Sequence, residues 1–114
     1  MITTFFLLSA CNNADKDNQK SKDKYDTSIN QVITLENEKL KKENKMEINR
    51  EEIGIVVYSD GELINLMYDY NKIKINSIYQ KKKDEYVLLP NNQTTYTKID
   101  EAGDSNYIEN LGTK

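Results

Sequence analysis

Residues 53–70 read IGIVVYSDGELINLMYDY and carry two strand patterns separated by a turn. Ile53 to Tyr58 is apolar and rich in β-branched residues, as is typical of strands, and Asp60-Gly61 is a strong short-range hairpin signal. Side chains alternate along the second strand, so we predict an antiparallel hairpin with one core face. That face carries Ile64, Leu66, Tyr68 and Tyr70, and the other face carries Leu63, Asn65, Met67 and Asp69.

The chain after Tyr70 continues in the same strand-like pattern. Ile73, Ile75 and Tyr79 predict an alternating third strand, which follows a turn at residues 71–72. Polar breaks at residues 81–84 and 90–92 divide the rest of the chain. The segments between and after them predict two more short strands, Tyr86–Leu89 and Thr94–Ile99. We therefore predict an antiparallel sheet of four to five strands.

The best helix candidate is Tyr25–Lys45, which reads YDTSINQVITLENEKLKKENK. At about 100° per residue its apolar side chains fall within one arc of about 100°, with Leu35 and Met46 on the flank. Capping oxygens at the start and lysines near the end suit the two helix termini. Because the apolar face needs a partner, we predict an α+β fold with this N-terminal amphipathic helix packed on the sheet. The face consists of Ile29, Val32, Ile33 and Leu40.

Glu36 is unusual because helical geometry places it in the middle of that apolar face. Two readings stay open: a functional carboxylate over the sheet, or a rim residue that partners a tyrosine hydroxyl or a lysine. The chain has eight tyrosines against two phenylalanines, and tyrosine covers a sheet face while its tip stays polar. The tyrosines either line a concave binding surface or are half-buried residues of a thin core. The candidate binding face is Glu36, Tyr58, Tyr68, Tyr70 and Tyr79.

A coiled coil is the alternative use of the same helix. With Ile33 and Leu40 at d positions, the a positions fall on Asn30, Asn37 and Asn44. Dimeric coiled coils accept an occasional asparagine at this position, but three in succession argue against a stable zipper. We therefore expect a monomer and keep a helix-mediated structural spacer as an alternative.

The composition narrows the function classes. The 114 residues leave room for one small domain, and the absence of histidine removes the commonest general base and metal ligand. The 16 basic and 19 acidic residues are too balanced for a nucleic-acid-binding surface. The single cysteine excludes an intramolecular disulfide and a cysteine-based zinc site. We expect no catalytic residues, no cofactor, no metal and no nucleic-acid partner.

Two charged segments have alternative readings. Lys81–Lys83 is a solvated turn that protects a sheet edge, or else a site for an anionic partner. Oxygen donors also gather late in the chain, but their spacing fails the EF-hand pattern, so we do not predict a calcium site. These late donors are Asp100, Glu101, Asp104, Asn106 and Glu109.

Residues 5–11 read FFLLSAC and resemble the end of a bacterial signal peptide with a lipobox. In a lipobox, Leu8, Ser9 and Ala10 would be recognised by the signal peptidase, and Cys11 would become the diacylated N-terminus. Ten residues precede Cys11 and none is charged, so we expect that the start lies inside a longer reading frame. The alternative is a short apolar segment with an ordinary thiol; the run is too short to span a bilayer.

Asn12 to Lys24 reads NNADKDNQKSKDK, in which Ala14 is the one apolar residue. Such a segment cannot bury enough surface to offset the entropy of ordering, so we predict a disordered tether with a reach of about 20 Å. Aspartates nearly cancel its lysines, which favours a plain linker over a lipid-binding segment. The predicted organisation is a signal peptide end at 1–11, a tether at 12–24 and one domain at 25–114.

The order and spacing of these motifs resemble a known family. After the lipobox come Tyr25-Asp26-x-x-Ile29-x-x-Val32-Ile33-x-Leu35-Glu36-x-x-x-Leu40-Lys41, then Val57-Tyr58-x-Asp60-Gly61 and Leu66-x-Tyr68. Over roughly residues 5–90 the chain resembles the small lipoproteins with a cystatin-like fold found in staphylococci and related Gram-positive bacteria. The resemblance implies a helix cradled by a curved antiparallel sheet on a membrane tether, in a family without an established activity.

The resemblance does not imply cystatin-type inhibition of proteases. Inhibitory cystatins use a Gln-x-Val-x-Gly hairpin and a Pro-Trp loop, whereas here Gln31-Val32 lies in the predicted helix and the chain has no tryptophan. We expect a lipid-anchored protein on the outer face of the cytoplasmic membrane, extracytoplasmic, that binds an envelope protein or another ligand. The alternative is an enzyme, or an accessory subunit of one, that uses Glu36 and tyrosine hydroxyls.

Overall fold

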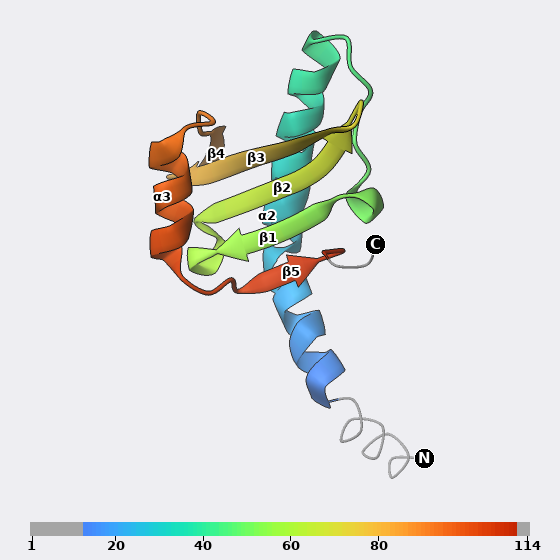
Figure 1. The fold of residues 1–114 in the computed structure, drawn as a ribbon. Helices are drawn as coiled ribbons and strands as arrows, with labels where there is room; N and C mark the ends of the chain where they lie inside the picture. Colours follow the sequence, from blue (N-terminus) through green and yellow to red (C-terminus); the bar gives the residue numbers. More distant parts are fainter. Residues whose placement is uncertain (1–12, 112–114) are drawn as a thin grey trace, which may run out of the picture.

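The computed structural model describes residues 13–111, with side chains from residue 20 onward. A long N-terminal helix packs against a five-stranded antiparallel sheet, and a short helix follows later (Figure 1). The predicted α+β class is therefore confirmed. The elements in chain order are α2 (Asn13–Lys42), η1 (Arg50–Glu52), β1 (Gly54–Tyr58), η2 (Ser59–Gly61), β2 (Leu63–Tyr70), β3 (Ile73–Lys82), β4 (Glu85–Leu88), α3 (Gln93–Ala102) and β5 (Tyr107–Glu109).

The sheet has the strand order β4-β3-β2-β1-β5, and each neighbouring pair is antiparallel. The predicted hairpin is confirmed, because β1 begins one residue after Ile53 and β2 has the predicted bounds. Ile55 lies opposite Leu66, and Val57 lies opposite Ile64. All four are 0% exposed, so they form the centre of the core.

The turn between β1 and β2 forms at the predicted Asp60-Gly61, inside η2. Asp60 and Gly61 take positive φ angles of 53° and 95°, a region that glycine enters freely and aspartate tolerates. Two distant tyrosines hold the turn: the Tyr25 hydroxyl donates to Asp60 Oδ1 over 2.7 Å, and the Tyr86 hydroxyl donates to the Gly61 carbonyl over 2.5 Å. The turn therefore ties α2 and β4 to the hairpin.

α2 crosses one face of the sheet and supplies its side of the core (Figure 1). The predicted apolar face is the buried one, since Ile29 and Val32 are 0% exposed and Leu40 is 3% exposed. Tyr25 is also buried and joins the same cluster. Burial of this face against the strands, more than helix propensity, stabilises α2.

The bounds of α2 differ from the prediction at both ends. Residues 13–24, expected to be a disordered tether, are helical. They contain no glycine or proline, so the helix continues outward from turns that the sheet fixes. At the other end α2 stops at Lys42, before the predicted Lys45. Asn44 takes a φ of 60°, and the Lys45 N–H donates to the Leu40 carbonyl over 2.8 Å, as in a Schellman cap.

The predicted fifth strand at Thr94–Ile99 is wrong, because this segment lies in the helix α3. Local capping outweighs the strand-like composition of the segment. The Asn92 side chain accepts a hydrogen bond from the Thr95 N–H over 3.1 Å, which caps the first turn, and Gly103 ends the helix with a φ of 78°. The fifth strand is instead β5, which pairs with β1.

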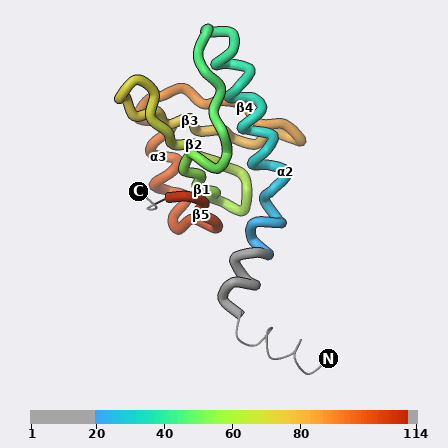
Figure 2. Tube along the Cα trace, turned by 90° about the vertical axis from the view of Figure 1, so that its right-hand side faces the viewer, coloured from blue at the N-terminus to red at the C-terminus, as the bar shows by residue number. Residues whose placement is uncertain are grey.

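The two helices lie on opposite sides of the sheet (Figure 2). We call the side that faces α2 the inner face and the other side the outer face. Val56 and Ile78, which point outward, are each 3% exposed. Further along the strands, Met67 is half-buried and Asp69 is exposed. The outer face is thus closed at one end and accessible at the other.

Candidate functional site

The inner face holds a buried carboxylate, that of Glu36 on α2, which is 0% exposed. It accepts hydrogen bonds from three hydroxyls, at 2.7 Å from Ser77, at 2.7 Å from Tyr79 and from Tyr68. Lys39, on the next turn, places its Nζ 3.5 Å from Glu36 Oε2. We call Glu36, Tyr68, Ser77 and Tyr79 the carboxylate cluster.

The strand register brings the three hydroxyls together. Tyr68 lies opposite Ile75, while Ser77 and Tyr79 lie opposite Leu66 and Ile64. Since directly opposed residues share a face and side chains alternate along a strand, all three hydroxyl groups point to the inner face. Glu36 lies one turn from the buried Val32 and Leu40, so the helix aims it at the same place.

The hydrogen bonds decide the charge state of the cluster. Burial alone raises the pKa of Glu36, but the hydrogen bonds from Tyr68, Tyr79 and Ser77, together with the Lys39 charge, outweigh it and hold the pKa below its ordinary value. Burial, and then the bond to Glu36, raise the pKa values of Tyr68 and Tyr79. At neutral pH the cluster therefore holds one carboxylate and protonated phenols.

The carboxylate of the cluster is buried, and both of its oxygens already accept hydrogen bonds. Three members of the cluster, Glu36, Ser77 and Tyr79, are at most 3% exposed. Both carboxylate oxygens already accept hydrogen bonds, and a base with a lowered pKa is a weak proton acceptor at neutral pH. The arrangement orients α2 on the sheet, and the Glu36 carboxylate itself is not exposed to solvent.

The five residues of the predicted binding face do not lie together. Glu36, Tyr68 and Tyr79 meet in the carboxylate cluster. Tyr70 lies nearer the β2–β3 turn, where Lys45 Nζ is 5.4 Å from the centre of its ring. Tyr58 lies opposite Leu63 on the outer face, away from the others. These residues therefore do not form one concave surface.

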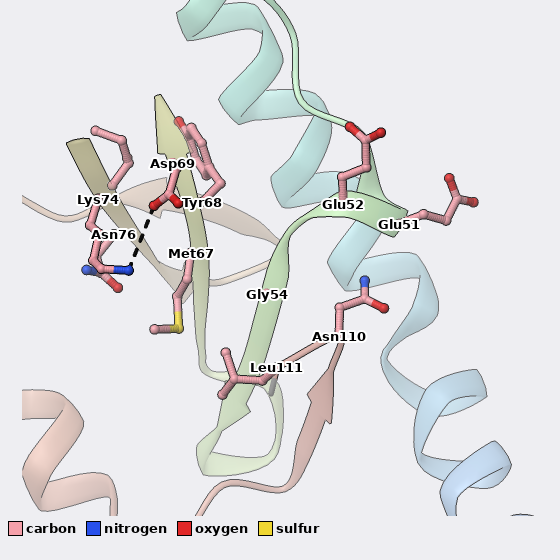
Figure 3. Close-up of a pocket in the computed structure, with 11 residues that line it drawn as sticks. Glu51, Glu52, Gly54, Met67, Tyr68, Asp69, Lys74, Asn76, Asn110 and Leu111 are labelled. Carbon is pink, nitrogen blue, oxygen red and sulfur yellow. Dashed lines mark ion pairs between the residues drawn. The ribbon is translucent and has the colours of Figure 1, made fainter. Parts of the chain in front are cut away.

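An open cavity lies on the outer face instead (Figure 3). Its volume is about 250 Å³. Met67 and Leu111 point into it beside the backbone of Gly54, with Glu51 and Glu52 on one side and Asp69 and Lys74 on the other. The remaining lining residues are Tyr68, Ile75, Asn76 and Asn110.

Sequence reasoning missed this cavity because its walls come from distant segments. Glu51 and Glu52 belong to η1, Met67 to β2, and Leu111 follows β5. Only pairing of β1 with both β2 and β5 brings them together. Gly54 allows the Leu111 side chain to lie close to the β1 backbone, since a Cβ at residue 54 would lie 2.8 Å from Leu111 Cδ1. The glycine inside a strand pattern was the one available signal of a close approach.

A second polar group, also missed from the sequence, joins both ends of the domain. Arg50 donates to both carboxylate oxygens of Glu109 at 2.8 Å, and to Asp26 Oδ1 at 2.6 Å. The Tyr107 hydroxyl donates to Glu109 Oε1 at 2.7 Å. The Arg50 guanidinium, despite partial burial, holds the pKa of Glu109 below its ordinary value. This group clamps the short β5 against α2 and η1.

The late oxygen donors are separated in the structure. Asp100 and Glu101 lie in α3, Asn106 accepts from the Asp60 N–H, and Glu109 binds Arg50. Within residues 20–111 no three acidic, histidine or cysteine side chains are grouped as metal ligands. Lys82 and Lys83, at the β3–β4 turn, are exposed, and Lys81 is partly buried.

The proposed lipid site lies outside the described residues. Leu8, Ser9, Ala10 and Cys11 all precede Asn13, where the description begins. Among the helices that are described, none has a stretch long and apolar enough to cross a bilayer.

The fold, the carboxylate cluster and the outer-face cavity define a small α+β domain with a helix on one sheet face and a cavity on the other. No protein-family profile matches the sequence, and no curated protein matches it significantly. Among solved structures, the fold is similar to that of a DUF4467 family protein from Staphylococcus aureus. The TM-score is 0.60 and the sequence identity 20%, over 75% of this chain and 95% of the other. At this identity the likeness shows a shared fold.

Proposed function

We propose that the chain is a lipid-anchored, non-enzymatic binding module, held at the outer face of the cytoplasmic membrane through Cys11. The observation that carries the proposal is that the chain is already helical at Asn13, two residues after Cys11 of the lipobox-like motif. The twelve residues from Asn13 to Lys24 measure about 18 Å along a helix axis. Such a helix would hold the domain clear of the bilayer.

The first side chains described on α2 fit a stalk. Lys20, Lys22 and Lys24 are exposed, and the buried face of the helix starts at Tyr25. Two acyl chains on Cys11 would supply the anchoring energy, at about 0.8 kcal/mol per buried CH₂. The resemblance of the sequence to cystatin-like lipoproteins implies the same plan.

The binding role rests on the contrast between the two sites. The buried carboxylate of Glu36 has all its partners within the chain, which argues against an enzyme or accessory subunit that works through it. The outer-face cavity is accessible and lined by charged groups. A helix-mediated spacer is also disfavoured, because Ile33 and Leu40, the d positions of the possible seam, are buried in the domain.

The anchor is tested by Cys11→Ser in the full-length precursor. We expect the protein to move from the membrane fraction to the medium, and to lose labelling by a clickable palmitate analogue. Ser9→Thr is a matched control, because it keeps Cys11 and changes the lipobox conservatively. Unchanged retention of Cys11→Ser in the membrane fraction would contradict the proposal.

A further inference from the structure

We propose that the outer-face cavity binds a lysine or arginine side chain presented by a basic peptide segment of an envelope partner. The inference rests on the binding role proposed above and names the class of partner. It is carried by the size of the cavity, its apolar floor and the charge of its rim.

The size of the cavity suits one side chain. About 250 Å³ is below the roughly 300–1,000 Å³ of pockets that enclose drug-sized ligands. A free amine small enough to fit would gain little affinity, since binding energy is limited per heavy atom. A side chain carried by a peptide gains further contacts around the rim.

The floor of the cavity is apolar. Met67 and Leu111 point into it, and Gly54 contributes backbone without a side chain (Figure 3). Leu111 is 43% exposed. The methylene stem of lysine or arginine packs on such a surface while its charged end stays at a polar rim. Methionine adapts its shape to the group that it contacts.

The rim carries an excess of negative charge. Glu51, Glu52 and Asp69 contribute three carboxylates, against the single ammonium of Lys74. That ammonium lies 4.0 Å from Asp69, so this ion pair carries no net charge. Glu51 and Glu52 are exposed and form no ion pair within residues 20–111. The negative charge of these two lining residues complements a cation.

The test is a titration of the purified chain with the peptide acetyl-Gly-Ser-Arg-Ser-Gly-amide, followed by amide chemical shifts. We expect weak, saturable binding with a Kd of about 0.1–1 mM at low salt. The shifts should centre on Gly54, Met67 and Leu111, and not on the lysine turn at 81–83. The same peptide with glutamine in place of arginine should produce no saturable shifts.

A matched pair of variants separates the site from the overall charge. Glu51→Gln with Glu52→Gln should weaken binding about tenfold, because it removes two carboxylates from the rim. Glu85→Gln with Glu101→Gln removes the same charge from exposed positions elsewhere and should leave the Kd within about twofold.

Three results would overturn the inference: equal loss in both double variants, shifts centred outside the cavity, or no saturable binding by the folded chain. Equal binding of spermidine, with the same shifts, would replace the peptide by a free polyamine and also overturn it. None of these results bears on the anchor. If Cys11→Ser were released from the membrane and the purified chain did not bind the peptide, this inference would be wrong and the proposed anchor would stand.

Discussion

The two faces of the sheet use polar side chains in opposite ways. On the inner face, Glu36 is 0% exposed and is satisfied by three hydroxyls. On the outer face, Glu51 and Glu52 are exposed beside a cavity of about 250 Å³. A polar group in the core is costly unless it is fully paired, whereas a polar group at a rim keeps its capacity to bind.

The contrast shows why the most conspicuous carboxylate is not the best site candidate. Glu36 interrupts an apolar helix face, yet its hydrogen-bond partners are three hydroxyls of the domain itself. The strongest predictions therefore concern stability at the inner face, and weaker effects are expected at the outer face.

The largest effect is expected from Glu36→Ala. The change removes the common acceptor of Tyr68, Ser77 and Tyr79 and leaves their hydroxyls in a dry space, so the free energy of unfolding should fall by about 3–5 kcal/mol. Chemical denaturation measures it. Glu38→Ala on the exposed side of α2 is the control and should change stability by less than about 0.5 kcal/mol. Equal effects of the two would remove the distinction between the faces.

A smaller loss is expected from Tyr79→Phe, which keeps the ring and removes one donor to the buried carboxylate. Hydrogen bonds to charged groups contribute about 1.5–3 kcal/mol, so unfolding should become easier by that amount. Tyr96→Phe, at a hydroxyl bonded to Asn91 on the surface, should have almost no effect. If both variants matched the wild type in urea denaturation, the Tyr79 bond would contribute nothing to stability.

The pH dependence of the free energy of unfolding should reflect the titration of Glu36. Its pKa is lowered by folding, so its contribution to stability is present above the ordinary value of 4.5 and is lost as the pH falls through the folded pKa. The difference in unfolding free energy between the wild type and Glu36→Gln should be constant from pH 8 to about pH 5 and should shrink below about pH 4.5. A difference that grows on acidification would mean that the folded pKa is raised.

The smallest effect on stability is expected at the outer rim. Glu51→Gln with Glu52→Gln should change the free energy of unfolding by less than about 0.5 kcal/mol, because both side chains are exposed and lack ion-pair partners within the described residues. Thermal melts and urea titrations check this. Strong destabilisation would show that the two carboxylates stabilise the fold, as Glu36 does, and the contrast between the two faces would then be wrong.

Local patterns were sufficient for the hairpin, the third and fourth strands and the buried face of α2. Alternation with period two identified β1 and β2, and helical spacing identified Ile29, Val32 and Leu40 as core. They also placed Glu36 on the core face. These features follow from the directions in which a regular backbone projects its side chains, which neighbours in sequence already encode.

Local capping and long-range packing decided the rest. The strand-like Thr94–Ile99 became a helix through the Asn92 cap, and α2 extended back to Asn13. The choice of Tyr68, Ser77 and Tyr79 as partners of Glu36 required the register of β2 and β3. The cavity required β5 to pair with β1 and carry Leu111 to Gly54. Neighbours in the sequence encode the direction and periodicity of side chains, but contacts between segments more than thirty residues apart depend on the free energy of the whole packed domain.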